Sequence, residues 1–166
     1  MTMMEKVLRS GIDLSPLGFG RDRTGKPLPE GAGLISGVSG GRFLRLSGCR
    51  DAVFYEPDGK NAVPVRVSRS FRRFLAVLFA AGDLTALAVL VSSRSLEEWE
   101  QYRAAHPKTE TQKAVLRQLR ELTGIRPSPD PFGEVTVSRI TCDVEFPIPA
   151  PEPKEYETVG LTEIVF

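Results

Sequence analysis

The sequence predicts an α+β protein with a central antiparallel sheet flanked by helices. Two observations carry this prediction. Residues 42–67 contain three short runs of strand-forming residues separated by turn signals. Residues 70–123 instead place apolar side chains at helical spacing behind residues that cap helices. Strands and helices are thus grouped in separate parts of the chain, an order typical of α+β folds.

The chain length of 166 residues suits one domain with a substantial core. We expect a single α+β domain over residues 1–166. It comprises a Gly/Pro-rich N-terminal part (1–41), a part with the sheet and the helices (42–123), and an extension with a late strand and a proline-rich tail (124–166).

The charges of the chain nearly cancel, because 22 Lys and Arg residues face 21 Asp and Glu residues. This balance argues against a dedicated nucleic-acid binder, which needs many uncompensated basic contacts, and it gives no polybasic membrane signal. The longest apolar run, Phe74–Leu90, is interrupted by polar residues and is slightly short for a membrane-spanning helix, so we interpret it as a buried helical hairpin. The first residues lack the pattern of a secretory signal, which makes a cytoplasmic location the default expectation.

The N-terminal part, residues 1–41, holds nine of the 15 glycines. Apart from one helical turn at Met3–Leu8, we expect loops and short extended pieces, because Gly and Pro disfavour long regular elements. The apolar piece Gly33–Val38 is a candidate strand.

Residues 42–67 are expected to form a small antiparallel meander. Arg42–Leu46 alternates between its two faces, and Ala52–Tyr55 is a compact run of strand formers. Pro57-Asp58-Gly59 supplies a turn, and Val63–Val67 places its valines on one face. Pro64 indicates an edge or the start of a strand.

Four helices are expected in residues 70–123, each starting at a residue that caps helices: Ser70, Asp83, Ser95 and Thr109. Behind the first cap, apolar residues recur at i, i+3, i+4 and i+7: Phe71, Phe74, Leu75 and Leu78. Glu98 and Gln112 follow the last two caps by three residues, which predicts reciprocal capping boxes. Gly82 and Gly124 favour left-handed helix ends. We expect Trp99 and Tyr102 to belong to the core.

The C-terminal extension changes character again. Pro127–Pro131 is expected to be a stiff connector, and the alternating apolar residues of Glu134–Phe146 predict a late strand. Pro147–Pro153 should run extended, and Thr162–Phe166 is a candidate edge strand.

The segment Gly20–Lys26 matches the glycine and lysine spacing of a phosphate loop. The next residue, Pro27, offers neither the hydroxyl nor the amide that this motif uses, and no apolar strand precedes the segment. We therefore favour a charged surface loop over a nucleotide site. For Gly37–Gly41 we favour a tight turn over an anion-binding nest.

The remaining candidates for chemistry have structural explanations. His106, the only histidine, is best explained as a cation near a helix C-terminus. Cys49 and Cys142 are too few for a disulfide scaffold or, with one histidine, for a structural zinc site. We expect two small buried thiols, and a disulfide between them stays open. No catalytic residue, cofactor site or metal site is predicted.

The central segment resembles the SUKH superfamily (Smi/Knr-like domains). The resemblance rests on a glycine pair, three strands with a turn, and a Ser-Phe-x-x-Phe-Leu helix start: Gly40-Gly41, Arg42–Leu46, Ala52–Tyr55, Asp58-Gly59, Val63–Val67 and Ser70–Leu75. It implies an α+β fold with a central antiparallel sheet. Bacterial members are largely regarded as immunity proteins that bind and neutralise polymorphic toxins, often nucleases, and such a role needs no active site.

We therefore expect a cytoplasmic, non-enzymatic protein that binds a cognate toxin or another protein. The residues predicted to contact the partner are exposed acids, one turn and two arginines: Glu97, Glu98, Glu100, Asp58, Lys60, Arg42 and Arg45. Two alternatives remain open. One is a regulatory or scaffold module, and the other is a small-ligand or nucleotide-binding protein that uses the glycine-rich first 41 residues.

Overall fold

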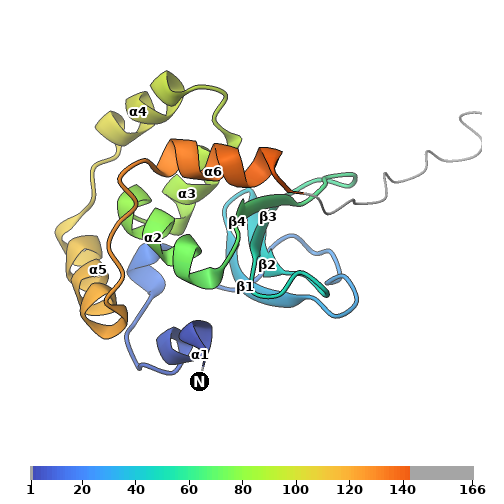
Figure 1. Ribbon diagram of the computed structural model, residues 1–166, viewed down its shortest axis with the longest axis horizontal. Coiled ribbons are helices and arrows are strands. Elements are labelled where there is room, and N and C mark those ends of the chain that lie inside the picture. Colours follow the sequence, from blue (N-terminus) through green and yellow to red (C-terminus); the bar gives the residue numbers. More distant parts are fainter. Residues whose placement is uncertain (1, 143–166) are drawn as a thin grey trace, which may run out of the picture.

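The computed structural model describes residues 2–142. Within these residues a four-stranded antiparallel sheet, in the order β1-β2-β3-β4, lies beside a group of helices (Figure 1). The predicted α+β class is confirmed. The elements are α1 (Met3–Leu8), the 3₁₀ turn η1 (Ser15–Leu17), β1 (Gly33–Val38), β2 (Gly41–Arg45), β3 (Val53–Pro57), β4 (Val65–Ser68), α2 (Phe71–Ala81), α3 (Leu84–Ser92), α4 (Leu96–Ala105), α5 (Glu110–Thr123) and α6 (Pro131–Ile140).

The sheet confirms the predicted meander and adds β1 to it. Each strand pairs with the next one along the chain, with Phe43 opposite Tyr55 in the central pair. A register shift between Leu34 and Ser36 bends β1. The last strand starts at Val65, after Pro64, because proline has no amide to donate to the ladder.

One face of the sheet packs on the helices and forms the core. Phe43, Tyr55 and Val67 all point to this side, where the ring of Phe43 lies 5.6 Å from that of Phe74 in α2. Nearly all of α2 and most of α3 are buried in the same cluster, as the predicted apolar hairpin requires. Among the described helices, none is by itself long and apolar enough to cross a membrane; α2 and α3 reach that length only together, and they are bent by 98°.

The opposite face of the sheet carries the segment 20–27, which is tied down by Arg42. The Arg42 side chain is 1% exposed and donates from Nε to Glu56 Oε1 and from Nη1 to Asp22 Oδ2, each at 2.6 Å. It also donates to the carbonyl oxygens of Lys26 and Pro27, at 3.0 and 3.1 Å. The segment 20–27 has little apolar surface. It is therefore held to the sheet by the Arg42 guanidinium, which donates to two carboxylates and two carbonyl oxygens.

The helix caps follow the sequence, with one correction. Ser70, Asp83 and Thr109 each accept a backbone amide as predicted, and Gln112 completes a reciprocal capping box with Thr109. Ser95 also accepts the Glu98 amide, but the Glu98 carboxylate bonds the amide of Arg94 and not that of the cap residue. The predicted reciprocal box at Ser95 is therefore wrong in its second half.

The predicted late strand is wrong over its described part, because residues 131–140 form α6. Asp130 caps this helix through the Gly133 amide, and Pro131 occupies a first-turn position where its missing amide costs nothing. Val135 is 2% exposed, whereas Val137 is 52% exposed, so the two valines do not share a face. The alternation of Val135 and Val137 is too short to be good evidence for a strand. The Asp130-Pro131 pair is a stronger signal, because it is typical of a helix start. The rest of the predicted strand, Pro147–Pro153 and Thr162–Phe166 lie outside the described residues.

Candidate functional site

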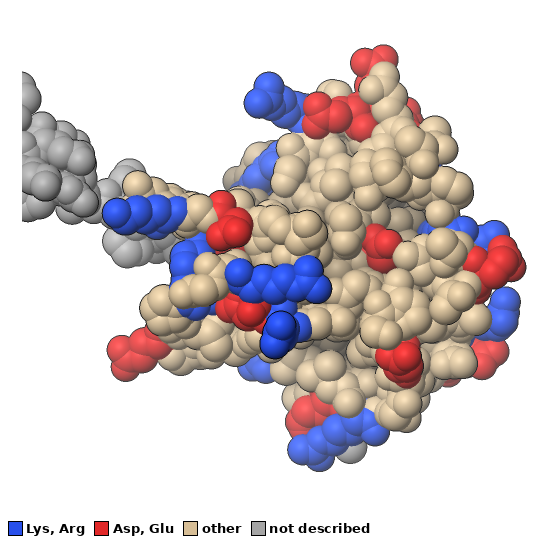
Figure 2. Space-filling view, turned by 180° about the vertical axis from the view of Figure 1, so that it is seen from behind, with Lys and Arg blue, Asp and Glu red and all other residues tan. Residues whose placement is uncertain are grey.

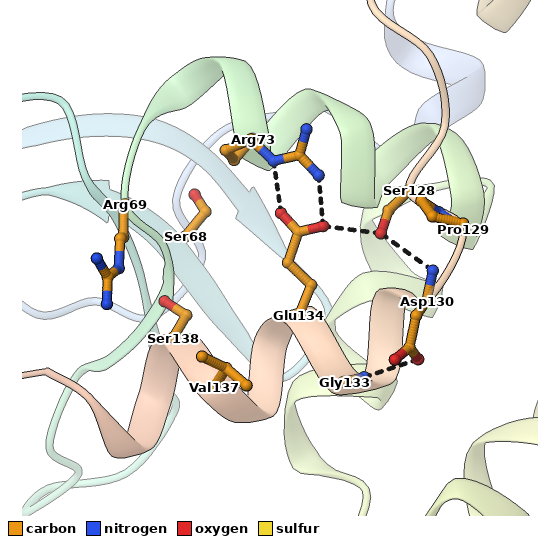
Figure 3. Close-up of a pocket in the computed structure, with 10 residues that line it drawn as sticks. All are labelled: Ser68, Arg69, Arg73, Ser128, Pro129, Asp130, Gly133, Glu134, Val137 and Ser138. Carbon is orange, nitrogen blue, oxygen red and sulfur yellow. Dashed lines mark hydrogen bonds and ion pairs between the residues drawn. The ribbon is translucent and has the colours of Figure 1, made fainter.

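A groove of about 500 Å³ runs between α6 and the junction of β4 with α2. Figure 3 shows its lining: Ser68, Arg69, Arg73, Ser128, Pro129, Asp130, Gly133, Glu134, Val137 and Ser138. At the amphipathic start of α2, Arg72 and Arg73 are exposed, and Arg73 contacts Glu134 in the first turn of α6. Residues some 60 positions apart therefore form one wall.

The strongest contact in this groove is a bidentate ion pair. Arg73 donates from Nη2 to Glu134 Oε1 at 2.6 Å and from Nε to Oε2 at 2.8 Å. The Ser128 hydroxyl also donates to Glu134 Oε1, at 2.8 Å. The hydrogen bonds that Arg73 donates to the Glu134 carboxylate raise the pKa of the Arg73 guanidinium. The two charges neutralise each other, so this end of the groove offers an incoming partner little net charge.

The opposite end of the groove holds a hydroxyl without a partner. Ser138 is 4% exposed, and its Oγ makes no hydrogen bond within the described residues. Arg66 donates to the Ser138 carbonyl at 3.2 Å, and Arg69 donates to the Thr141 hydroxyl at 3.1 Å, which fastens α6 to β4. Since no described imidazole or carboxylate bonds the Ser138 hydroxyl, it lacks the base that would activate a serine nucleophile.

A second groove, of about 550 Å³, lies between α4 and the start of α6. Its lining combines apolar and charged residues: Leu96, Trp99, Glu100, Arg103, Ala104, Pro129, Asp130, Pro131 and Phe132. Trp99 is 2% exposed, as predicted for a core residue, and the Arg103 guanidinium lies 5.9 Å from its ring centroid. Leu96, by contrast, is 47% exposed at the edge.

The two grooves share Pro129 and Asp130, so they flank the N-terminal half of α6 on either side. We call the two grooves together the α6 surface. Exposed apolar side chains stand on it, since Leu96 lines the second groove and Val137 the first.

On the face of the molecule seen from behind, basic and acidic side chains are intermingled (Figure 2).

Of the predicted partner contacts, Glu97, Glu98 and Glu100 are exposed on α4. Glu100 lines the second groove, and Glu98 is engaged with the Arg94 amide. These acids therefore lie beside the α6 surface.

The other predicted contacts lie elsewhere. Asp58 and Lys60 are exposed in the β3–β4 connection, at the far end of the molecule from α4 (Figure 1). Arg45 is half-buried and lines a separate hollow beside α1, in which its Nε has no partner among the described residues. The Arg42 guanidinium does not fit the prediction of an exposed contact residue, because it is buried and paired with Asp22 and Glu56 inside the protein. The structure therefore does not gather the seven residues into one patch.

The segment Gly20–Lys26, which has the residue spacing of a phosphate loop, has a structural role. The Lys26 ammonium donates to the carbonyl of Gly59 at 2.9 Å and to that of Pro57 at 3.3 Å, and it lies 3.4 Å from Glu56. Lys26, which would bind phosphate in a true phosphate loop, therefore binds the end of β3 and the connection that follows it.

The histidine and the cysteines are not part of a reactive cluster. His106 ends α4, where its ring stacks on Tyr102 with centroids 4.1 Å apart. Cys49 and Cys142 form no disulfide with each other and are both half-buried, so the prediction of two buried thiols holds only in part. Residues 2–142 contain no group of three or more His, Cys, Asp or Glu side chains that could hold a metal ion.

Sequence reasoning missed the α6 surface, because it assigned the helix to a strand. The signal that would have found it is the Asp130-Pro131 helix start, followed by Glu134 in the first turn. Comparisons of this chain with family models, with curated proteins and with solved structures give no match.

Proposed function

We propose that this protein is a non-enzymatic domain that binds another protein through the α6 surface. The observation that carries the proposal is the pair of adjoining grooves on either side of α6, with exposed Leu96 and Val137 on them. Exposed apolar side chains beside grooves with a polar rim are features of protein-binding sites.

The charges beside the second groove indicate what kind of partner would complement it. Glu97 and Glu100 make no ion pair within residues 2–142, and Glu100 stands at the rim above the Trp99 floor. Of the two arginines that line the first groove, Arg73 is already neutralised by Glu134. The complementary partner therefore presents an apolar anchor flanked by basic side chains. The SUKH resemblance suggests a basic toxin such as a nuclease, and neutralising it is the specific form of this proposal.

A binding measurement with the protein encoded beside this one tests the proposal. Association rates are measured across a salt series for the wild type and for E97K/E100K. We expect the double variant to associate at least tenfold more slowly, with a weaker dependence on salt, because complementary charge acts mainly on the association rate. Glu121→Lys, an exposed charge reversal on α5, serves as the matched control and should behave as the wild type.

A second variant, Ala104→Trp, fills the second groove without changing its charge. It should weaken binding through faster dissociation. A neighbour that binds the wild type and both α4 variants equally well would exclude the α6 surface. Co-expression then separates the biological roles: rescue from a toxic neighbour supports neutralisation, and binding without rescue supports a regulatory or scaffold module.

A further inference from the structure

A small hollow of about 220 Å³ between α5 and the C-terminal end of α2 is lined by positive charge. Four basic side chains line it together with the apolar side chains of Phe79 and Leu116: Lys108, Lys113, Arg117 and Arg120. Among its described lining residues there is no acid. In a chain with a net charge of only +1, such a concentration is unusual.

The spacing along α5 creates most of this cluster. Lys113, Arg117 and Arg120 follow one another at i, i+4 and i+7, so they occupy one helix face. Like charges at this spacing repel and destabilise a helix. Glu110 offsets Lys113 at 3.1 Å, but Arg117 and Arg120 make no ion pair with any described residue. The helix alone therefore leaves two guanidinium groups uncompensated.

Lys108 adds a fourth charge from the loop before α5. Its Nζ donates to the Phe79 carbonyl at 3.0 Å, near the C-terminal end of α2, and this bond fixes the ammonium at the hollow. Burial, and then repulsion from Arg103, Arg120 and Lys113, lowers the pKa of Lys108. A solvated helix face explains the three bases of α5, and the bond to the end of α2 explains the position of Lys108. Together these two local arrangements bring four positive charges to one hollow.

We propose that this hollow binds a phosphate group, either inorganic phosphate or the phosphate of a small monoester. Four cations exceed what a single carboxylate neutralises, and two of them are guanidinium groups, whose planar donors match phosphate oxygens in pairs. The apolar walls of Phe79 and Leu116 strengthen the attraction by keeping water away on one side. The volume is below that of sites for drug-sized ligands, which favours a ligand the size of a phosphate group. The proposal is independent of the α6 surface, since it uses none of the residues that line the two grooves.

Titration of the full chain tests this site. Thermal unfolding is followed while inorganic phosphate is added against sodium chloride of equal ionic strength, with a parallel series in glycerol phosphate. We expect a saturable rise in Tm with phosphate over chloride. The variant R117Q/R120Q should weaken the apparent Kd at least tenfold, while R72Q/R94Q, which removes two exposed arginines elsewhere, should leave it unchanged.

Tighter binding of glycerol phosphate than of inorganic phosphate assigns the site to a monoester, and the reverse order assigns it to free phosphate. The proposal fails if chloride at equal ionic strength raises Tm as much as phosphate. It also fails if R117Q/R120Q, with wild-type circular dichroism, responds to phosphate as the wild type does.

Discussion

The side-chain amide of Gln112 donates a hydrogen bond of 2.7 Å to the carboxylate of Asp83. Each of these residues also serves its own helix, since Asp83 accepts the Ala86 amide and Gln112 accepts the Thr109 amide. Gln112 further donates to the Pro16 carbonyl at 3.2 Å. One side chain thus joins the starts of α3 and α5 to η1, so that local helix signals become a tertiary contact.

Gln112→Glu should separate the local role from the tertiary one. Glutamate completes a capping box as well as glutamine does, but its carboxylate does not donate to Asp83 or to Pro16. We expect a loss of about 1–3 kcal/mol in the free energy of unfolding at pH 7, measured by urea denaturation. Gln118→Glu, on an exposed position of the same helix, is the control. An equal effect of both variants would mean that the contact with Asp83 contributes nothing.

Arg42→Met should be among the most damaging changes on the sheet. It leaves Glu56 and Asp22 without the guanidinium that both contact at 2.6 Å, and a buried ion pair broken on one side costs about 3–5 kcal/mol. Arg72→Met, at an exposed position, should stay within about 0.5 kcal/mol of the wild type. Chemical denaturation of the two variants decides the matter. A small effect at Arg42 would show that the segment 20–27 does not depend on it.

Asp22 should make stability fall in acid. Burial opposes the charged form, but the amide and hydroxyl of Thr24 and the Arg42 guanidinium outweigh it and lower the pKa of Asp22 from 3.8 to about 2. Because the folded-state pKa is depressed, the unfolded chain binds this proton first. The contribution, about 2 kcal/mol, is therefore present above pH 4 and is lost as the pH falls toward 2.

The measurement is the free energy of unfolding between pH 5 and pH 2 for the wild type and for Asp22→Asn. The variant should be less stable at pH 5 and should show a shallower decline. Parallel curves for the two proteins would contradict the assignment to Asp22.

Gly37→Ala should destabilise the protein although its backbone conformation allows alanine. A Cβ at this position would overlap the carbonyl of Arg21, where the segment 20–27 crosses β1. We expect a cost of about 1–3 kcal/mol, the range for overpacking. Gly33→Ala, in the same strand, places its Cβ in open space and should be nearly neutral. Thermal unfolding of the pair measures the difference, and equal Tm values would show that the loop moves away freely.

Much of the fold could be predicted because its signals are local. Turn residues and alternation located β2 and β3, and the caps Ser70, Asp83 and Thr109 located three helices, since each cap acts within one turn of its own backbone. The same kind of signal existed for α6 in Asp130-Pro131, but the alternation of Val135 and Val137 outweighed it in the prediction. Burial of Val135 and exposure of Val137 settle the question in favour of the helix.

The candidate site was harder to predict, because it is made by segments far apart in the chain. As a charged residue in a short strand, Arg42 was predicted to be exposed. Its side chain is buried only because the segment 20–27 lies across that face of the sheet. Glu100 and Phe132 line the same groove only because α4 and α6 both pack against α3.

By itself the sequence determined the α+β class, the order of β2, β3 and β4 and most helix boundaries, because these depend on the periodicity of side chains and on capping within a few residues. Only the tertiary structure decided which charged side chains form ion pairs inside the protein and which remain exposed on its surface. That outcome depends on which charged groups, distant in the sequence, lie close together and away from water once the chain has folded, because both conditions strengthen their interaction.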